Sequence, residues 1–163
     1  MITITDKENC MGCYACATIC PKTCISMESD NEGFWYPVVD HARCIECGMC
    51  VKVCPIIQTP HKEREQGTKP LAYAAYNKDD TVRLDSSSGG LFTLIAEEVL
   101  SVGGVVFGAR FDDRFNVIHD YVEKVDELSK FRGSKYVQSR IGDSYERVRE
   151  FLQQGRLVLF TGT

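Results

Sequence analysis

Two copies of one short cysteine pattern constrain the fold more than any other feature of the chain. Each copy reads C-x2-C-x2-C-x3-C-P, and a constant offset carries Cys10 onto Cys44 and Pro21 onto Pro55. Three thiols separated by two residues each can wrap one tight loop around a multi-iron centre. The proline after the fourth cysteine breaks the local helix and turns that thiol elsewhere. The repeat therefore predicts two polynuclear metal centres.

The spacing resembles that of bacterial two-cluster ferredoxins, in which the fourth cysteine of each run ligates the other 4Fe–4S cluster. The resemblance implies an α+β two-cluster bacterial-type ferredoxin domain over residues 1–59. It also implies one crossed ligand set for each cluster. The first set is Cys10, Cys13, Cys16 and Cys54, and the second is Cys44, Cys47, Cys50 and Cys20.

Two other uses of cysteine fit the pattern less well. Structural zinc sites take their four ligands from separated C-x2-C pairs, without a third cysteine at the next step followed by C-P. A disulfide framework suits small secreted chains, but residues 1–9 contain no apolar signal core and nine cysteines is an odd number. The ninth, Cys24, is expected to be a small buried hydrophobe lining a cluster, with a redox-active or substitute-ligand role as the alternative.

The charge balance indicates an acidic electron carrier. The formal net charge is −4, and two oxidised clusters with four thiolates each would add about −4 more. Such a protein docks onto basic surfaces of redox partners and has no electrostatic reason to bind nucleic acid. Eight thiolate ligands imply a reducing compartment, so a cytoplasmic protein is expected. No stretch approaches the apolar length of a membrane span.

Hydrophobic periodicity divides the chain into three parts. Residues 1–59 contain a short strand at 2–5 and a hairpin with arms at 25–28 and 34–39; residues 60–70 form a polar, proline-bounded linker. Residues 71–163 read as part of an α/β domain. Its expected strands are 71–76, 105–111, 116–123 and 156–160, and its expected helices are 90–102 and 143–153. A β-type run leading into Thr161-Gly162-Thr163 suggests part of a longer protein.

Two segments of the second half are suited to anions. Ser86-Ser-Ser-Gly-Gly90 precedes a helix, where serine can cap, glycine lets a ligand approach, and free N–H groups favour negative charge. The alternative is an ordinary capped helix start. Residues 130–140 carry four basic and no acidic side chains around a glycine turn, which is either an anion contact or a solvated basic face. His41, His61 and His119 follow no ligand pattern and are expected to be structural or solvated.

These segments, in this order behind the cysteine repeat, resemble the coenzyme F-420 hydrogenase/dehydrogenase beta-subunit family. The matching pieces are the Ser86–Gly90 run, Gly133-Ser-Lys-Tyr136 and the closing Leu159-Phe-Thr-Gly-Thr163. Family members are similar iron–sulfur flavoproteins that bind FAD and exchange electrons between clusters and a deazaflavin or another acceptor. The resemblance implies a set of residues near the flavin: Ser88, Gly89, Gly90, Gly133, Ser134 and Lys135.

Two hypotheses follow for the function. The first is an oxidoreductase that passes electrons between two 4Fe–4S clusters and FAD, with coenzyme F-420 or another acceptor in the full-length protein and a redox partner protein or subunit. The second is a ferredoxin-type electron-transfer module whose α/β part only docks to a partner enzyme. Flavin in the purified protein would separate them.

Overall fold

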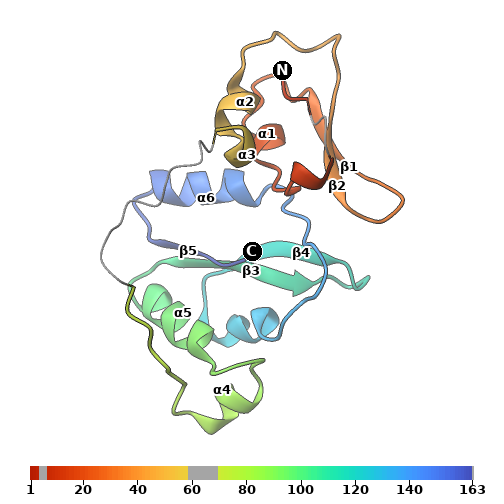
Figure 1. The fold of residues 1–163 in the computed structure, drawn as a ribbon. Helices are drawn as coiled ribbons and strands as arrows, with labels where there is room; N and C mark the ends of the chain where they lie inside the picture. Colours follow the sequence, from red (N-terminus) through yellow and green to blue (C-terminus); the bar gives the residue numbers. More distant parts are fainter. Residues whose placement is uncertain (4–6, 59–69, 163) are drawn as a thin grey trace. The chain divides into compact units, whose positions relative to one another are not determined.

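The computed structural model describes residues 1–3, 7–58 and 70–162 of the 163-residue chain. It divides into two compact units, Met1–Pro70 and Leu71–Thr163. Figure 1 colours the chain by sequence position, from red at the N-terminus to blue at the C-terminus. The predicted linker at 60–70 lies, except for Pro70, outside the described residues.

The first unit is built from short elements around its cysteines. In chain order they are η1 (Lys7–Asn9), α1 (Ala15–Thr18), β1 (Ile25–Ser29), β2 (Trp35–Val39), α2 (Met49–Val53) and α3 (Pro55–Gln58). The two strands form an antiparallel hairpin, with Ile25 opposite Val39 and Ser29 opposite Trp35, as predicted. Asp30 closes the turn, because its Oδ1 accepts from the N–H groups of Glu32 and Phe34.

Thiols form much of the core of this unit. Its buried cluster comprises two aliphatic residues and four cysteines: Ile2, Ile25, Cys16, Cys24, Cys50 and Cys54. So small a unit cannot bury enough apolar surface for a large core. Groups held by these cysteines would therefore complete the interior. The predicted strand at 2–5 lies partly outside the described residues, and Ile2 and Thr3 are not in a strand.

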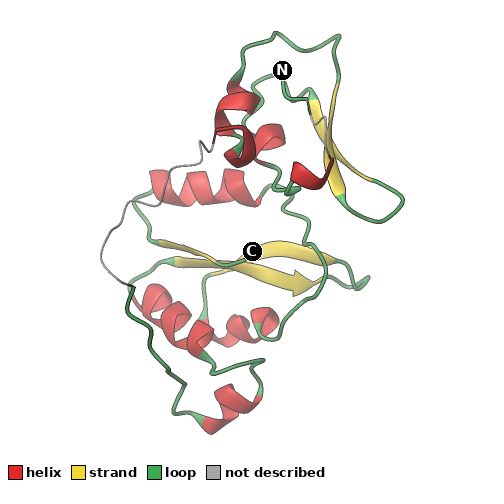
Figure 2. Cartoon of the chain, viewed as in Figure 1, coloured by secondary structure: helices red, strands yellow, loops and turns green. Residues whose placement is uncertain are grey.

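The second unit is a three-stranded sheet with helices against both faces, as Figures 1 and 2 show. Its elements are α4 (Asp80–Leu84), α5 (Leu91–Ser101), β3 (Val105–Phe111), β4 (Val117–Val122), η2 (Val125–Phe131), α6 (Ser144–Gln153) and β5 (Val158–Phe160). The strand order is β4-β3-β5, where β3 pairs antiparallel with β4 and parallel with β5. A parallel pair covered on both faces is typical of α/β architecture.

Each face of the sheet has its own apolar core. Helices α5 and η2 pack on one face, through residues that include Ala96, Val106 and Leu128. Helix α6 covers the other face, where Phe151 packs on Val105 and Phe107. The alternation of inward residues along β3 thus supplies both layers. The predicted helices and the strands from residue 105 onward are confirmed to within a few residues at their ends.

Three details of the sequence interpretation are wrong. Residues 71–76 form no strand in the described structure, because they pair with no neighbour and their side chains are exposed. On α5 the buried face is centred on Thr93, Ala96 and Val99. The sequence pattern predicts one apolar stripe on this helix, formed by Leu91, Phe92, Leu94, Ile95, Val99 and Leu100. Three of these residues, Leu91, Leu94 and Ile95, are instead exposed. The short helices and η2 were not anticipated, since elements of three to seven residues have too little periodicity to detect.

Candidate functional site

The two cysteine loops adopt the same backbone conformation at equivalent positions. The residues before and after the second cysteine of each loop are left-handed: Gly12 (φ 57°) and Tyr14 (φ 64°) in the first, Glu46 (φ 53°) and Gly48 (φ 74°) in the second. Tyrosine and glutamate adopt this conformation at a cost of about 1–3 kcal/mol. Successive N–H groups in such turns form concavities that suit an iron–sulfur cluster, which is anionic once its core is ligated by four thiolates. The repeat in sequence is therefore a repeat in structure.

The first loop forms one wall of a cavity of about 190 Å³. Its lining contains Cys10, Cys13, Cys16 and Cys54, the four thiols that sequence analysis grouped as one ligand set. Apolar side chains such as Ile2 complete the lining. One water molecule needs about 10–15 Å³ by the same measure, so the cavity has room for a group much larger than a water, and its four thiols are the donors that a 4Fe–4S cluster takes. The residues therefore fit a 4Fe–4S cluster.

The second loop lines a smaller cavity of about 20 Å³ together with Cys20. Its cysteines are Cys20, Cys24, Cys44, Cys47 and Cys50, which are the other predicted ligand set plus the ninth cysteine. Three of these cysteines, Cys20, Cys44 and Cys47, are partly exposed or exposed. Four thiols of this set are the donors that a 4Fe–4S cluster takes.

The thiols in these cavities are held in unequal environments. Burial, together with the neighbouring Cys13, raises the pKa of the Cys16 thiol to about 11. Burial also acts on Cys20, but hydrogen bonds from the backbone and side chain of Cys24 outweigh it and lower the pKa of Cys20. The hydrogen bond to Cys20 raises the pKa of Cys24 to about 11. The two Sγ atoms lie 3.3 Å apart, with Cys24 as the better donor and Cys20 as the better acceptor.

In the second unit, the two segments predicted to suit anions come together. The backbone N–H of Ser134 donates to Oγ of Ser87 at 2.7 Å, across 47 residues of sequence. Arg132 adds a contact from the same turn to Asp85, with Nη1 and Oδ2 3.9 Å apart. The loop before α5 and the turn after η2 therefore form one surface of the second unit.

Glycine occupies positions 89, 90 and 133 of these segments for different structural reasons. A Cβ on Gly89 would lie 2.7 Å from the carbonyl oxygen of Ala75, so its missing side chain is explained by the chain itself. Gly90 is left-handed (φ 73°) and is the N-cap of α5, without a side-chain cap. The serines do not cap this helix, contrary to expectation: Ser86 Oγ donates to Val82 O. Gly133 is left-handed (φ 78°) beside open space.

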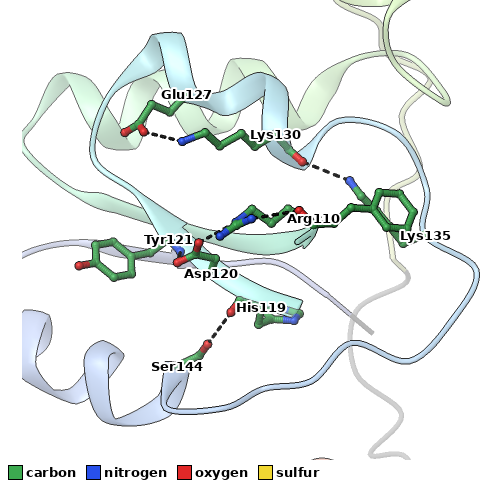
Figure 3. A network of polar contacts seen from close by, with 9 residues as sticks. Arg110, His119, Asp120, Tyr121, Glu127, Lys130, Lys135 and Ser144 are labelled. Atoms are coloured by element: carbon green, nitrogen blue, oxygen red, sulfur yellow. Dashed lines mark hydrogen bonds and ion pairs between the residues drawn. The ribbon is translucent and has the colours of Figure 1, made fainter. Parts of the chain in front are cut away.

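Lys135 is a partly buried cation. Its Nζ donates to the carbonyl oxygens of Arg132 at 2.8 Å and Lys130 at 3.4 Å. Figure 3 shows the contact with Lys130, whose own amine pairs with Glu127. In the part of the chain that the structure describes, no carboxylate lies within ion-pair distance of Lys135. Burial lowers the pKa of Lys135, so a bound anion would offset the cost of its charge.

One buried polar residue that positions the loop before α5 was missed in the sequence. Asn77 is 4% exposed, its N–H donates to Gly89 O at 2.6 Å, and its Nδ2 contacts Gly90 O at 3.4 Å. His119 joins β4 to the end of the chain: its Nδ1 lies 2.7 Å from Ser139 Oγ and its Nε2 2.8 Å from Thr161 O. His119 is therefore structural, as expected. Asn77 lies in a polar run, so the sequence gives no sign that it is buried and bonded to the glycines before α5.

The two units together define an iron–sulfur dicluster protein that carries an α/β unit. Residues 9–56 match the model of a 4Fe-4S dicluster domain, and a second dicluster model matches residues 43–90. The two matches overlap on the second cysteine loop. None of the helices in the described ranges is long and apolar enough to cross a lipid bilayer.

The α/β unit has a family of its own. Residues 72–144 match the model described as coenzyme F420 hydrogenase/dehydrogenase, beta subunit N-term. The match covers 73 of the 163 residues and confirms the resemblance seen in the sequence. No curated protein matches the chain. The chain therefore combines matches to iron–sulfur dicluster domains with a match to the N-terminal part of this beta-subunit family, and together they indicate a role in redox electron transfer.

Proposed function

We propose that the protein is an iron–sulfur oxidoreductase that passes electrons between two 4Fe–4S clusters and FAD. The observation that carries this proposal is the hydrogen bond from Ser134 to Ser87, which joins two anion-suited segments in a unit preceded by two cysteine loops. The match to the beta-subunit family supports a redox role for that unit. We also propose that the acceptor is a deazaflavin such as coenzyme F-420 or another two-electron carrier, exchanged with a partner subunit.

The proposed cluster ligands are the two crossed sets of the sequence analysis. Their grouping around two cavities supports this assignment. The clusters, when bound, would supply one-electron transfer. The chain would hold them through thiolates and through the N–H groups of the left-handed turns, and it would limit water through apolar residues such as Ile2 and Ile56.

The proposed flavin contacts divide between backbone and side chain. FAD, when bound, would supply the coupling of one-electron to two-electron chemistry. Ser88, Gly89, Gly90, Gly133 and Ser134 would offer main-chain groups near its phosphates or ring. The open space beside Gly133 supports close approach there. Lys135 would place its ammonium against the negative charge of the cofactor.

The rival function is a ferredoxin-type module whose α/β unit binds only a partner enzyme. The exposed α5 residues Leu91, Leu94 and Ile95 are compatible with such docking. Under this alternative the purified protein would contain iron and sulfide but no flavin, and the anion-suited surface would bind FAD no better than any basic surface.

A FAD titration under anaerobic conditions tests the proposal. Lys135→Ala should weaken FAD binding by about tenfold or more, because a hydrogen bond to a charged group contributes about 1.5–3 kcal/mol. Lys130→Ala is the matched control, since it removes a nearby lysine that already pairs with Glu127. Equal affinities for the two variants would contradict the proposed site.

A further inference from the structure

Cys24 has no place in either proposed ligand set, yet it lies inside the second cluster cavity. It is 4% exposed and its Sγ is 3.3 Å from the Sγ of Cys20, a proposed ligand. Cys20 itself is partly exposed. The first cavity has no fifth cysteine of this kind. The residue four positions after Cys54, which corresponds to Cys24 in the second repeat, is Gln58.

The segment between the two thiols is held in a turn that keeps them together. Thr23 is left-handed (φ 45°), and its N–H donates to Cys20 O at 3.1 Å. Arg43 fixes the same segment from the second cysteine loop: its Nη2 donates to Lys22 O at 2.9 Å and to Thr23 Oγ1 at 3.0 Å. The approach of the two sulfur atoms therefore belongs to a turn with several independent restraints.

We propose that Cys20 and Cys24 form a reversible disulfide when hydrogen peroxide removes the second cluster. The inference rests on the proposed role of Cys20 as a ligand. In the first step the released Cys20 thiolate attacks peroxide, so that an S–O bond forms, the O–O bond breaks and hydroxide leaves. In the second step the Cys24 sulfur attacks the sulfenic acid, an S–S bond forms, the S–O bond breaks and water leaves. Overall, one thiolate, one thiol and one peroxide give one disulfide, one water and one hydroxide.

The disulfide would protect both sulfur atoms and block the site. A sulfenic acid that meets no thiol is oxidised further to sulfinic and sulfonic acids, which thiol reductants do not restore. A neighbouring thiol prevents this by condensing with the sulfenic acid. While the bond persists, Cys20 cannot act as a ligand, so the second cluster cannot be rebuilt until a reductant opens the bond. The first cluster site has no extra cysteine that could form an equivalent disulfide.

Peptide mapping of the full protein after oxidation tests this inference. Holoprotein is treated with peroxide and an iron chelator, free thiols are alkylated, and trypsin is added. Trypsin cleaves after Lys22, so the disulfide joins peptide 8–22 to peptide 23–43, in which Cys24 is the sole cysteine. We expect this linked pair to be the main fate of Cys24, with fragmentation placing the bond at Cys20.

Rebuilding with iron and sulfide provides the functional readout. Without a thiol reductant, oxidised wild-type protein should regain about four irons, and with reductant about eight. Cys24→Ser and Cys24→Ala should hold about eight irons before oxidation. After oxidation these variants should show no linked peptide. The number of irons that they regain should not rise from about four to about eight when reductant is added, as it does in the wild type.

Free Cys24 after cluster loss, or Cys24 bonded to another cysteine, would overturn the inference. The inference would also be overturned if a thiol reductant increased the iron content of the rebuilt wild type and of the rebuilt Cys24 variants by the same amount. Fewer than about eight irons in untreated protein would instead contradict the proposed ligand sets. The two failures are therefore distinguishable.

Discussion

The substitution Ser87→Ala probes whether the two anion-suited segments form one site. Ser87 Oγ is the acceptor for the Ser134 N–H at 2.7 Å, and this bond fixes the turn at 133–135 against the loop before α5. Both residues are exposed, so water can replace the lost acceptor. The net effect on stability should therefore be at the low end of the usual range of about 0.5–1.5 kcal/mol.

The expected effect on FAD affinity follows from the same contact. If the site must be organised before FAD binds, the same loss of about 0.5–1.5 kcal/mol raises Kd by roughly two- to tenfold. Flavin fluorescence titration under anaerobic conditions measures it. Ser101→Ala is the matched control, because Ser101 is also exposed and its Oγ donates to Glu98 O at the far end of α5.

Equal FAD affinities for Ser87→Ala and Ser101→Ala would refute the reasoning. A large fall in the melting temperature of Ser87→Ala alone would also count against it, because it would show that the contact serves folding and not the site. The proposal requires weaker binding with nearly unchanged stability.

Three further predictions concern the clusters and the second unit. Cys20→Ala should lower iron content by about four and leave the cluster of Cys10 and its partners intact, as measured by iron analysis and EPR; selective loss of the other cluster would show that the ligand sets are wrong. Leu128→Ala should destabilise the second unit by about 2–5 kcal/mol, because Leu128 is 0% exposed; a smaller change in urea unfolding would contradict the packing of η2. A hydrogen bond from the Asn116 side chain lowers the pKa of Asp112 against the effect of burial, aided by two backbone N–H groups. Its stabilisation is therefore present above the ordinary Asp pKa of about 3.9 and lost as pH falls through the lowered value. Asp112→Ala should reduce the melting temperature at pH 7 but not in strong acid, and a pH-independent difference would refute this.

The sequence predicted the elements whose patterns are long and local. The cysteine repeat marked both loops, and the hairpin, α5, α6, β3 and β4 followed from periodicity or turn residues. The strand predicted at 71–76 is wrong because a short run of apolar residues does not by itself provide a strand with a partner. The buried face of α5 was misjudged because the small residues Thr93 and Ala96 are buried, whereas the larger Leu94 and Ile95 are exposed.

The candidate flavin surface was predictable in its parts but not in its assembly. Motif pieces at 86–90 and 133–135 were visible, and only the fold shows that Ser87 and Ser134 meet. The sequence also does not show why glycine is needed at position 89. Gly89 accommodates the backbone of Ala75, and this long-range contact has no local signal in the sequence. The same holds for the approach of Cys24 to Cys20, which depends on a turn held by Arg43.

The most direct test of the account is the cofactor stoichiometry of the anaerobically purified protein. Iron, acid-labile sulfide and flavin are measured on one sample, with zinc as a further assay. Two four-iron clusters and one flavin predict about eight irons, eight sulfides and one FAD per chain. About eight irons without any FAD, even after incubation with excess FAD, would contradict the flavin site and favour the ferredoxin-type module. About four irons, or stoichiometric zinc, would contradict the two clusters themselves.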